Sequence, residues 1–439
     1  ADNTVTTLED APYTFSAASF GFTDVSDAPA NALNAVVITS LPLNGTLTLG
    51  PGATAPGAVT LNQVVAAADL DKLIFTPATN ANGMAYAAFT FQVRDDGGTL
   101  NGGSNQDVSN NTITINVTSV NDAPAGTDKT IATLEDTPIT LAVADFGFSD
   151  LNDSPANAFA SIYVTSLPTT GTLTLGPGSA APGAVTVGQV IVAADLDKLI
   201  FTPALNANGL ANSVFTFQVQ DNGGTANSGV ERDQSANSIT FDVTSVNDAP
   251  DGTSKTMTTL EDTALGFTAA DFGFTDVSDA PANALNAVVI TSLPVNGTLT
   301  LGPASSAPGA VTLNQVILAA DLDDLIFTPV ANANGAAYAA FTFQVRDDGG
   351  TANGGINQDA SANTITIDVT SVNDAPAGTS KTLTTLEDTA ITLAVADFGF
   401  SDLNDSPANA FASIYVTSLP TTGTLTLGPG SAAPGAVTV

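Results

Sequence analysis

Residues 213–224 have the sequence Ser-Val-Phe-Thr-Phe-Gln-Val-Gln-Asp-Asn-Gly-Gly, in which apolar side chains recur at every second position. Phe215, Phe217 and Val219 would share one face of a β-strand, and the Asp-Asn-Gly-Gly that follows predicts the turn that ends it. The same period of two recurs in Ile239–Val243 and in other short runs, separated by Gly, Pro, Asn and Asp. About seven or eight such strands predict an all-β, antiparallel Greek-key sandwich.

One stretch departs from the period of two. Residues 188–199 contain Val-Ala-Ala-Asp-Leu-Asp-Lys-Leu, which is more typical of a helical turn than of a strand. We expect a turn of helix there, with Asp195 as its N-cap, because Asp is among the preferred residues at that position.

The sandwich pattern repeats along the chain. The triplet Leu-Glu-Asp places its glutamate at Glu9, Glu135, Glu261 and Glu387, each 126 residues after the last, and Asn-Asp-Ala-Pro recurs with the same period. A period of this length indicates an array of whole domains rather than a solenoid of short units. We therefore predict sandwiches arranged end to end, called repeats 1 to 4: 1–124, 125–250, 251–376 and the first half of a fourth at 377–439.

Alternate repeats are more alike than neighbours. Residues 139–187 and 391–439 are identical, as are residues 24–42 and 276–294. Two explanations remain open: dissimilar neighbours exchange strands less often during folding, or a pair of domains was duplicated by accident. The last repeat lacks a counterpart of residues 188–250, so we expect the native chain to continue beyond Val439.

Charge and composition exclude several functions. Of 439 residues, 43 are acidic and 8 are basic, so the formal net charge is −35, the wrong sign for binding nucleic acid or anionic lipid. The chain has no histidine and no cysteine, which excludes Ser–His triads, thiolate nucleophiles, disulfides and His- or Cys-ligated zinc. No run of apolar residues is long enough to insert into a membrane. We predict that the chain is not an enzyme.

Several motifs indicate a family. In repeat 2 these are Thr-Leu-Glu-Asp at 133–136, Gly-Thr-Leu-Thr-Leu at 171–175, Phe-Thr-Pro-Ala-Leu-Asn-Ala-Asn-Gly at 201–209, and Val-Thr-Ser-Val-Asn-Asp-Ala-Pro at 243–250. With these motifs the whole chain resembles bacterial cadherin-like and Ig-like tandem repeats, the modules stacked in giant secreted adhesins of the RTX and biofilm-associated type.

The resemblance to cadherins implies a calcium site at each junction between repeats. In cadherins the ion is held by a glutamate near the domain start, an Asx-rich linker and aspartates of the next domain. The cadherin Asp-Arg-Glu motif is absent here, which implies fewer or weaker ions per junction. The positions that match are Glu9, Asn121, Asp122, Asp150, Asp153 and Asp221; then Glu135, Asn247, Asp248, Asp276, Asp279 and Asp347; then Glu261, Asn373, Asp374, Asp402 and Asp405.

The chemistry of these side chains supports calcium independently of the resemblance. Calcium takes six to eight oxygen ligands from carboxylates, carbonyls and water, and like charges crowded at a junction repel unless a cation neutralises them. The alternative is that the same Asp and Asn residues are solvated turn formers and caps. Asp195 and Asp197 form a second, weaker calcium candidate.

The resemblance, together with the near-identical repeats, implies two alternative functions. The first is a calcium-stiffened stalk or spacer of a large bacterial surface adhesin, extracellular or on the cell surface, acting in cell adhesion or in a biofilm matrix. The second is a structural subunit of a secreted filament, sheath or matrix fibre. A module that binds a glycan or a protein is a third, weaker option. The expected partners are neighbouring repeats of the same chain and other copies of it.

Overall fold

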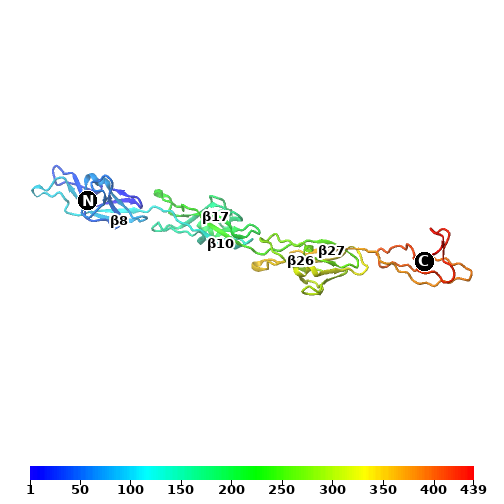
Figure 1. The fold of residues 1–439 in the computed structure, drawn as a ribbon. Coiled ribbons are helices and arrows are strands. Elements are labelled where there is room, and N and C mark those ends of the chain that lie inside the picture. Colours follow the sequence, from blue (N-terminus) through cyan, green and yellow to red (C-terminus); the bar gives the residue numbers. More distant parts are fainter. The chain divides into compact units, whose positions relative to one another are not determined.

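The structure, a computed structural model, describes residues 1–439 and divides into two compact units, Ala1–Ser245 and Val246–Val439. Repeats 1 to 3 each contain one five-stranded and one four-stranded β-sheet (Figure 1). The all-β class is confirmed, with nine strands in each of these repeats rather than seven or eight. The additional strands, such as Tyr13–Thr14 and Gly57–Ala58, have two residues each, too few for an alternating pattern to be visible.

The five-stranded sheets share one strand order. In repeat 1 it is β1 (Asn3–Leu8), β9 (Asn111–Thr118), β8 (Gly83–Asp95), β3 (Leu33–Ile38) and β6 (Val64–Ala66). In repeat 2 it is β10 (Lys129–Leu134), β18 (Asn237–Thr244), β17 (Gly209–Asp221), β12 (Phe159–Ser166) and β15 (Val190–Val192). In repeat 3 it is β19 (Lys255–Leu260), β27 (Asn363–Thr370), β26 (Gly335–Asp347), β21 (Leu285–Ile290) and β24 (Val316–Leu318).

The four-stranded sheets also share one order. In repeat 1 it is β2 (Tyr13–Thr14), β7 (Leu73–Thr76), β4 (Thr46–Leu49) and β5 (Gly57–Ala58). In repeat 2 it is β11 (Ile139–Thr140), β16 (Leu199–Thr202), β13 (Thr172–Leu175) and β14 (Gly183–Ala184). In repeat 3 it is β20 (Leu265–Gly266), β25 (Leu325–Thr328), β22 (Thr298–Leu301) and β23 (Gly309–Ala310).

One pair of strands in each of repeats 1 to 3 is parallel, where the sequence predicts antiparallel pairing throughout. The first strand lies beside the last: β1 pairs with β9 over six positions, from Asn3 opposite Ile113 to Leu8 opposite Thr118. The same parallel pairing joins β10 to β18 and β19 to β27. A parallel pair needs a long crossover connection, and here nearly the whole repeat supplies it.

The helices are short 3₁₀ turns, and none of them is long and apolar enough to cross a membrane. The turn predicted in residues 188–199 is present as η5, but Asp195 is not its N-cap: Val192 holds that position, and Asp195 lies inside the first turn. The carboxylate of Asp195 instead accepts hydrogen bonds from the Ala180 N–H and the Lys198 ammonium, both at 2.8 Å. The turns are η1 (Ala17–Phe20), η2 (Ala67–Lys72), η3 (Leu100–Gly102), η4 (Val143–Phe146), η5 (Ala193–Lys198), η6 (Ala226–Ser228), η7 (Ala269–Phe272), η8 (Ala319–Asp324), η9 (Ala352–Gly354) and η10 (Val395–Phe398).

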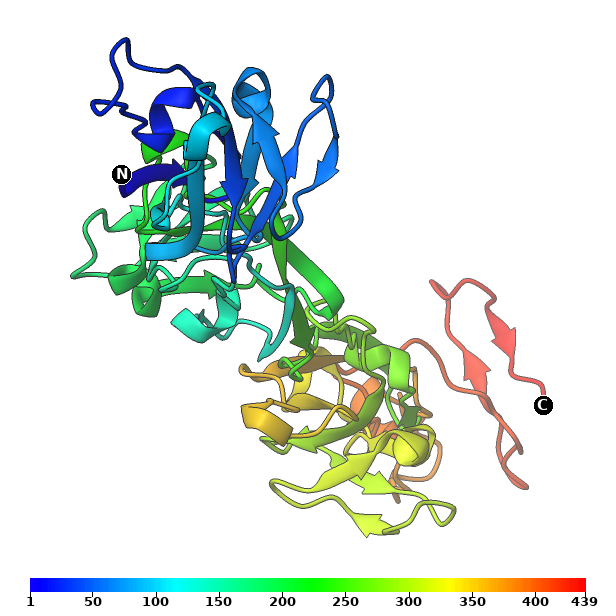
Figure 2. The same ribbon diagram turned by 90° about the vertical axis from the view of Figure 1, so that its left-hand side faces the viewer.

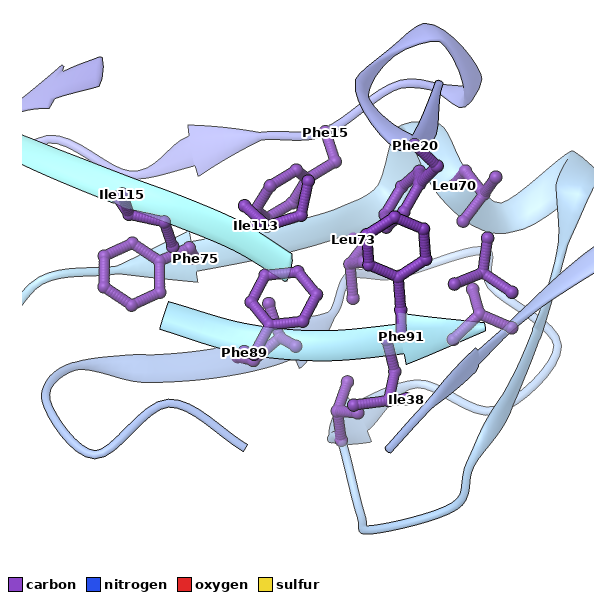
Figure 3. Packing of buried hydrophobic residues seen from close by; sticks show 14 of the residues in the cluster. Phe15, Phe20, Ile38, Leu70, Leu73, Phe75, Phe89, Phe91, Ile113 and Ile115 are labelled. Carbon is purple, nitrogen blue, oxygen red and sulfur yellow. The ribbon is translucent and has the colours of Figure 1, made fainter. Parts of the chain in front are cut away.

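A separate apolar core lies between the two sheets of each of repeats 1 to 3. In repeat 1 this core includes Phe75 of the four-stranded sheet and Phe89, Phe91 and Ile113 of the five-stranded sheet, and all four are fully buried (Figure 3). Burying one such side chain contributes about 1.5–3 kcal/mol, so each core can stabilise its own sandwich.

Residues 377–439 form little regular structure. Because residues 391–398 and 413–419 are identical to the early-strand segments 139–146 and 161–167 of repeat 2, strands are expected there, but the structure has only the turn η10 in the first and no strand in the second. Two short strands, β28 (Thr426–Leu427) and β29 (Gly435–Ala436), appear as the red arrows in Figure 2. A strand needs a neighbour for its backbone hydrogen bonds, and this segment has no counterparts of β16, β17 and β18.

Candidate metal site at the junctions between repeats

The linker residue Asn121 lies against three elements of repeat 2. Its Nδ2 donates to Asp221 Oδ1 at 3.0 Å and to the Val230 carbonyl at 2.8 Å, and its backbone carbonyl accepts from the Val230 N–H at 2.7 Å. Its Oδ1 accepts a hydrogen bond from Asn157 Nδ2. Both polar groups of the Asn121 side chain are therefore hydrogen bonded to residues of repeat 2.

Gly223 leaves the space that Asn121 occupies. A Cβ at position 223 would fall 1.6 Å from Asn121 Oδ1 and 2.5 Å from Asn157 Nδ2. Glycine is required there because the linker side chain approaches the backbone itself.

The next linker residue, Asp122, joins a cluster of carboxylates. Its backbone N–H donates to Asp153 Oδ2 at 3.1 Å. Burial raises the pKa of Asp122, and the charges of Asp10, Glu9 and Asp150 raise it further. Glu9 and Asp10 of repeat 1 and Asp150 of repeat 2 therefore lie close enough to the linker residue Asp122 for their charges to interact with it.

The aspartates of repeat 2 in this cluster are also buried, with about 6% exposure for Asp150 and Asp153 and 3% for Asp221. Burial raises the pKa of Asp153 to about 6, and the charges of Asp150 and Asp122 contribute. Burial is likewise the largest cause of the raised pKa of Asp221. A raised carboxyl pKa means that the negative charge lacks compensation at this junction.

Three oxygens in this cluster are buried without a hydrogen-bond partner: Asp122 Oδ2, Asp150 Oδ1 and Asp221 Oδ2. The other oxygen of each of Asp150 and Asp221 is bonded, to the Asn157 N–H and to Asn121 Nδ2 respectively. Buried polar atoms in proteins are almost always paired, so these oxygens call for a ligand that is not protein.

Glu9 has a different environment. Its Oε1 accepts from the Val120 N–H at 2.5 Å and from Ser119 Oγ at 3.1 Å, and its Oε2 accepts from Asn82 Nδ2 at 3.0 Å. It ties the end of repeat 1 to its start, so a cation would have to share oxygens that are already hydrogen bonded. Glu135 and Glu261 bond the corresponding Asn208 and Asn334 at 3.0 Å.

The unit 246–439 repeats parts of this arrangement at two places. Asn247 bonds Asp347 and Asn283, the Asp248 N–H bonds Asp279, and burial raises the pKa of Asp279 to about 6. Glu135, the remaining predicted ligand of that set, lies in the unit 1–245. In the third set the Asp374 N–H bonds Asp405, and the pKa of Asp374 is raised by burial and by Asp262, Asp405, Glu261 and Asp402. Buried oxygens without a hydrogen-bond partner in this unit include Asp276 Oδ1, Asp347 Oδ2, Asp374 Oδ2 and Asp402 Oδ1.

Sequence reasoning missed two members of the cluster. Asn157 donates from its backbone to Asp150 and from its side chain to Asn121, and it recurs as Asn283 and Asn409. Asp10 adds its charge beside Asp122. Both could have been found, because Asn157 follows Asp150 by seven residues in every copy and Asp10 adjoins Glu9.

The weaker calcium candidate, Asp195 with Asp197, is explained without a metal. Lys198 lies 2.8 Å from Asp195 and 4.0 Å from Asp197. The hydrogen bond from Lys198, together with that from Ala180, lowers the pKa of Asp195. A carboxylate that already has a cationic partner gains little from a second cation.

The junction residues fit calcium by type. No group of three or more His, Cys, Asp or Glu side chains lies close enough together to form a metal site by itself. Calcium also accepts amide oxygens, backbone carbonyls and water as ligands, so a complete shell need not come from carboxylates alone. The unpartnered oxygens of Asp122, Asp150 and Asp221 are of the kind that a hard cation prefers.

No protein-family model and no curated protein matches the chain. Among solved structures it is similar to Drosophila N-cadherin EC1-4 (13% identity, 86% of this chain and 75% of that chain, TM-score 0.30). It is also similar to human CDH23 EC21-23 (16%, 83% and 99%, 0.34) and to mouse protocadherin-24 EC1-3 (14%, 84% and 97%, 0.35). At these identities and scores the similarity carries no conclusion about function.

Proposed function

We propose that this chain is an extracellular, non-enzymatic repeat region whose junctions bind calcium and are stiffened by it. In that role it serves as a stalk or spacer of a large bacterial surface adhesin, as its sequence motifs suggest. The observation that carries the proposal is the buried carboxylate oxygens that lack a hydrogen-bond partner beside each linker. We also propose that each repeat, bounded at Pro124, Pro250 and Pro376, is the domain that the junctions connect.

At the first junction Asp122, Asp150, Asp153 and Asp221 would contribute carboxylate oxygens to the ion, backbone carbonyls and water would complete its shell, and Glu9 and Asp10 would contribute charge. Calcium would supply the positive charge that these buried carboxylates lack. The residues themselves orient the ligands: Asn157 fixes Asp150, and Asn121 fixes Asp221. Because Asp122 belongs to the linker and the others to the flanking repeats, binding would restrict motion between the two.

A calcium titration followed by thermal melting tests this proposal. We expect the unfolding temperature to rise with calcium, because a ligand at a hundred times its Kd stabilises the folded state by about 2.7 kcal/mol. The triple variant Asp150→Asn, Asp276→Asn, Asp402→Asn should lose most of this rise.

Asp24→Asn is the matched control for the calcium titration. Asp24 accepts from the Asn31 N–H at 2.8 Å as Asp150 accepts from Asn157, but unlike Asp150 it has no buried oxygen without a hydrogen-bond partner. This variant should keep the calcium response. A melting temperature of the unaltered chain that does not depend on calcium would refute the calcium proposal.

The second candidate is a structural subunit of a secreted filament. It is favoured by the apolar side chains that residues 377–439 expose, since Ile414 is 46% and Tyr415 85% exposed and such surfaces mark interaction sites. Electron microscopy separates the two functions, because only this candidate predicts filaments of the purified chain.

A further inference from the structure

The exposed apolar face of residues 391–427 has an identical counterpart that is covered. In repeat 2, Leu141, Ile162 and Leu175 are at most 5% exposed. The same residues in repeat 4, Leu393, Ile414 and Leu427, are 39%, 46% and 50% exposed, and the first two line an open groove of about 640 Å³. In repeat 2 the covering elements are β16, β17 and β18, all within residues 188–250. We call residues 62–124, 188–250 and 314–376 the late halves of repeats 1, 2 and 3, and the residues before them the early halves.

The cores of neighbouring repeats are built differently across these halves. In repeat 1 the ring of Phe89, in the late half, lies 5.5 Å from Phe15 of the early half, edge to face. In repeat 2 the corresponding Phe215 lies 6.2 Å from Phe241, which belongs to the late half and stacks on Phe201 at 3.8 Å. The phenylalanine at this position therefore contacts a ring of the early half in repeat 1 and a ring of the late half in repeat 2.

The two positions involved change together, so that their combined size is kept. At the first position, in the early half, repeats 1 and 3 have phenylalanine and repeat 2 has leucine. At the second position, in the late half, repeats 1 and 3 have isoleucine and repeat 2 has phenylalanine. Repeat 4 carries Leu393 and is therefore of the repeat 2 kind. The pairs are Phe15 with Ile115, Phe267 with Ile367, and Leu141 with Phe241.

Two polar contacts also differ between the kinds. The Arg232 guanidinium lies 4.0 Å from the ring centroid of Tyr163, and the repeat 4 counterpart of that tyrosine, Tyr415, is 85% exposed. Ser213 Oγ, fully buried, donates to the Thr170 carbonyl at 2.6 Å. In repeat 1 the counterpart of Ser213 is Ala87, which has no hydroxyl to make this bond, whereas the neighbouring bond from Asn44 Nδ2 to the Tyr86 carbonyl (2.9 Å) has a counterpart from Thr170 Oγ1 to the Asn212 carbonyl (2.8 Å).

We infer that the face over residues 391–427 is a docking surface for a segment with the sequence of residues 188–250, and that the alternating cores make the late halves of neighbouring repeats poor substitutes for it. A late half of the repeat 3 kind would place isoleucine where Phe241 lies, in the same core as the leucine at the Leu393 position, and leave a cavity. In the opposite mismatch, Phe267 and a counterpart of Phe241 would crowd one another. The alternation therefore directs each early half to its own kind of partner, independently of calcium.

Two extended chains test the inference. One carries a copy of residues 188–250 after Val439, and the other carries a copy of residues 314–376 at the same place. Limited proteolysis and denaturant unfolding would follow repeat 4 in each. We expect the first chain to protect residues 377–439, and the second to give a folding equilibrium for repeat 4 on the order of 30-fold lower.

Restoring the pair should restore the repeat. In the second chain, Leu393→Phe recreates the pair of repeats 1 and 3, and it should recover most of the lost stability. The same change in the first chain should destabilise repeat 4, because two rings would then compete for one space. The docking surface is refuted if the first chain leaves residues 377–439 sensitive to protease. The preference of repeat 4 for a late half of the repeat 2 kind is refuted if repeat 4 is equally stable in the two chains. It is also refuted if Leu393→Phe changes the stability of repeat 4 in the same direction in both.

Discussion

Replacing Gly223 by alanine should detach Asn121 from repeat 2 and loosen the first junction by about 3 kcal/mol, through the overlap and the lost hydrogen bonds together. The added methyl would lie 1.6 Å from Asn121 Oδ1, so the linker side chain could not keep its place. Hydrogen exchange of the Val230 amide reports the change, because this N–H donates to the Asn121 carbonyl. We expect it to exchange about 100-fold faster, since each 1.4 kcal/mol corresponds to tenfold.

Gly266→Ala provides the control for this substitution. A Cβ at Gly266 meets nothing within 4 Å, and the residue needs no left-handed backbone, so this change should leave the Val230 exchange rate unaltered. The amide of Phe215, in the core of repeat 2, should stay protected in both variants, which separates a loosened junction from an unfolded repeat. Unchanged protection of Val230 in the Gly223 variant would contradict the role given to Asn121.

In calcium-free buffer the chain should melt at a higher temperature at pH 5 than at pH 7.5, by about 3 °C or more for each kcal/mol involved. Asp153 and Asp279 have folded pKa values of about 6, above the ordinary 3.8. The folded state binds these two protons more tightly than the unfolded state, so protonation stabilises the fold. This stabilisation is complete below the unfolded pKa and is lost as the pH rises through 6. Carboxyls with lowered pKa values, such as Asp69 at about 2, lose their contribution only below this window.

Calcium should reverse this dependence on pH. A bound cation replaces the proton, so with calcium present the chain should be more stable at pH 7.5, where the carboxylates are ionised. The double variant Asp153→Asn, Asp279→Asn should flatten the calcium-free pH dependence, whereas Asp27→Asn, the exposed counterpart in repeat 1, should leave it intact. A melting temperature that falls from pH 7.5 to pH 5 without calcium would contradict the assignment.

The sandwich could be predicted from sequence because its signal is local. Phe215, Phe217 and Val219 alternate along a single strand, and all three are buried in the structure. The pairing of β1 with β9 could not be predicted in this way, since it joins residues about 110 positions apart and neither strand encodes the direction of its neighbour. The N-cap assigned to Asp195 was wrong for a related reason, because the carboxylate bonds Ala180 in a distant loop.

Most of the candidate site could also be predicted, because the acidic residues recur with the 126-residue period. Sequence alone could not separate Glu9, whose oxygens are hydrogen bonded within repeat 1, from Asp150, which keeps a buried oxygen without a partner. That distinction depends on which donors the folded chain brings near each carboxylate. Asn157 was missed because it bears no charge, although its side chain completes the contacts of Asn121.

The parallel pairing of first and last strands has a mechanical consequence. When a repeat is pulled by its two ends, the force enters at the start of β1 and leaves at the end of β9, so the two strands are drawn past each other along their length. Their paired positions, from Asn3 opposite Ile113 to Leu8 opposite Thr118, are then loaded together in shear rather than opened one after another. Resistance to forced unfolding depends on the unfolding rate, and a shear geometry raises the barrier that sets it. Repeats 2 and 3 share this geometry, so each would act as a separate clamp under tension.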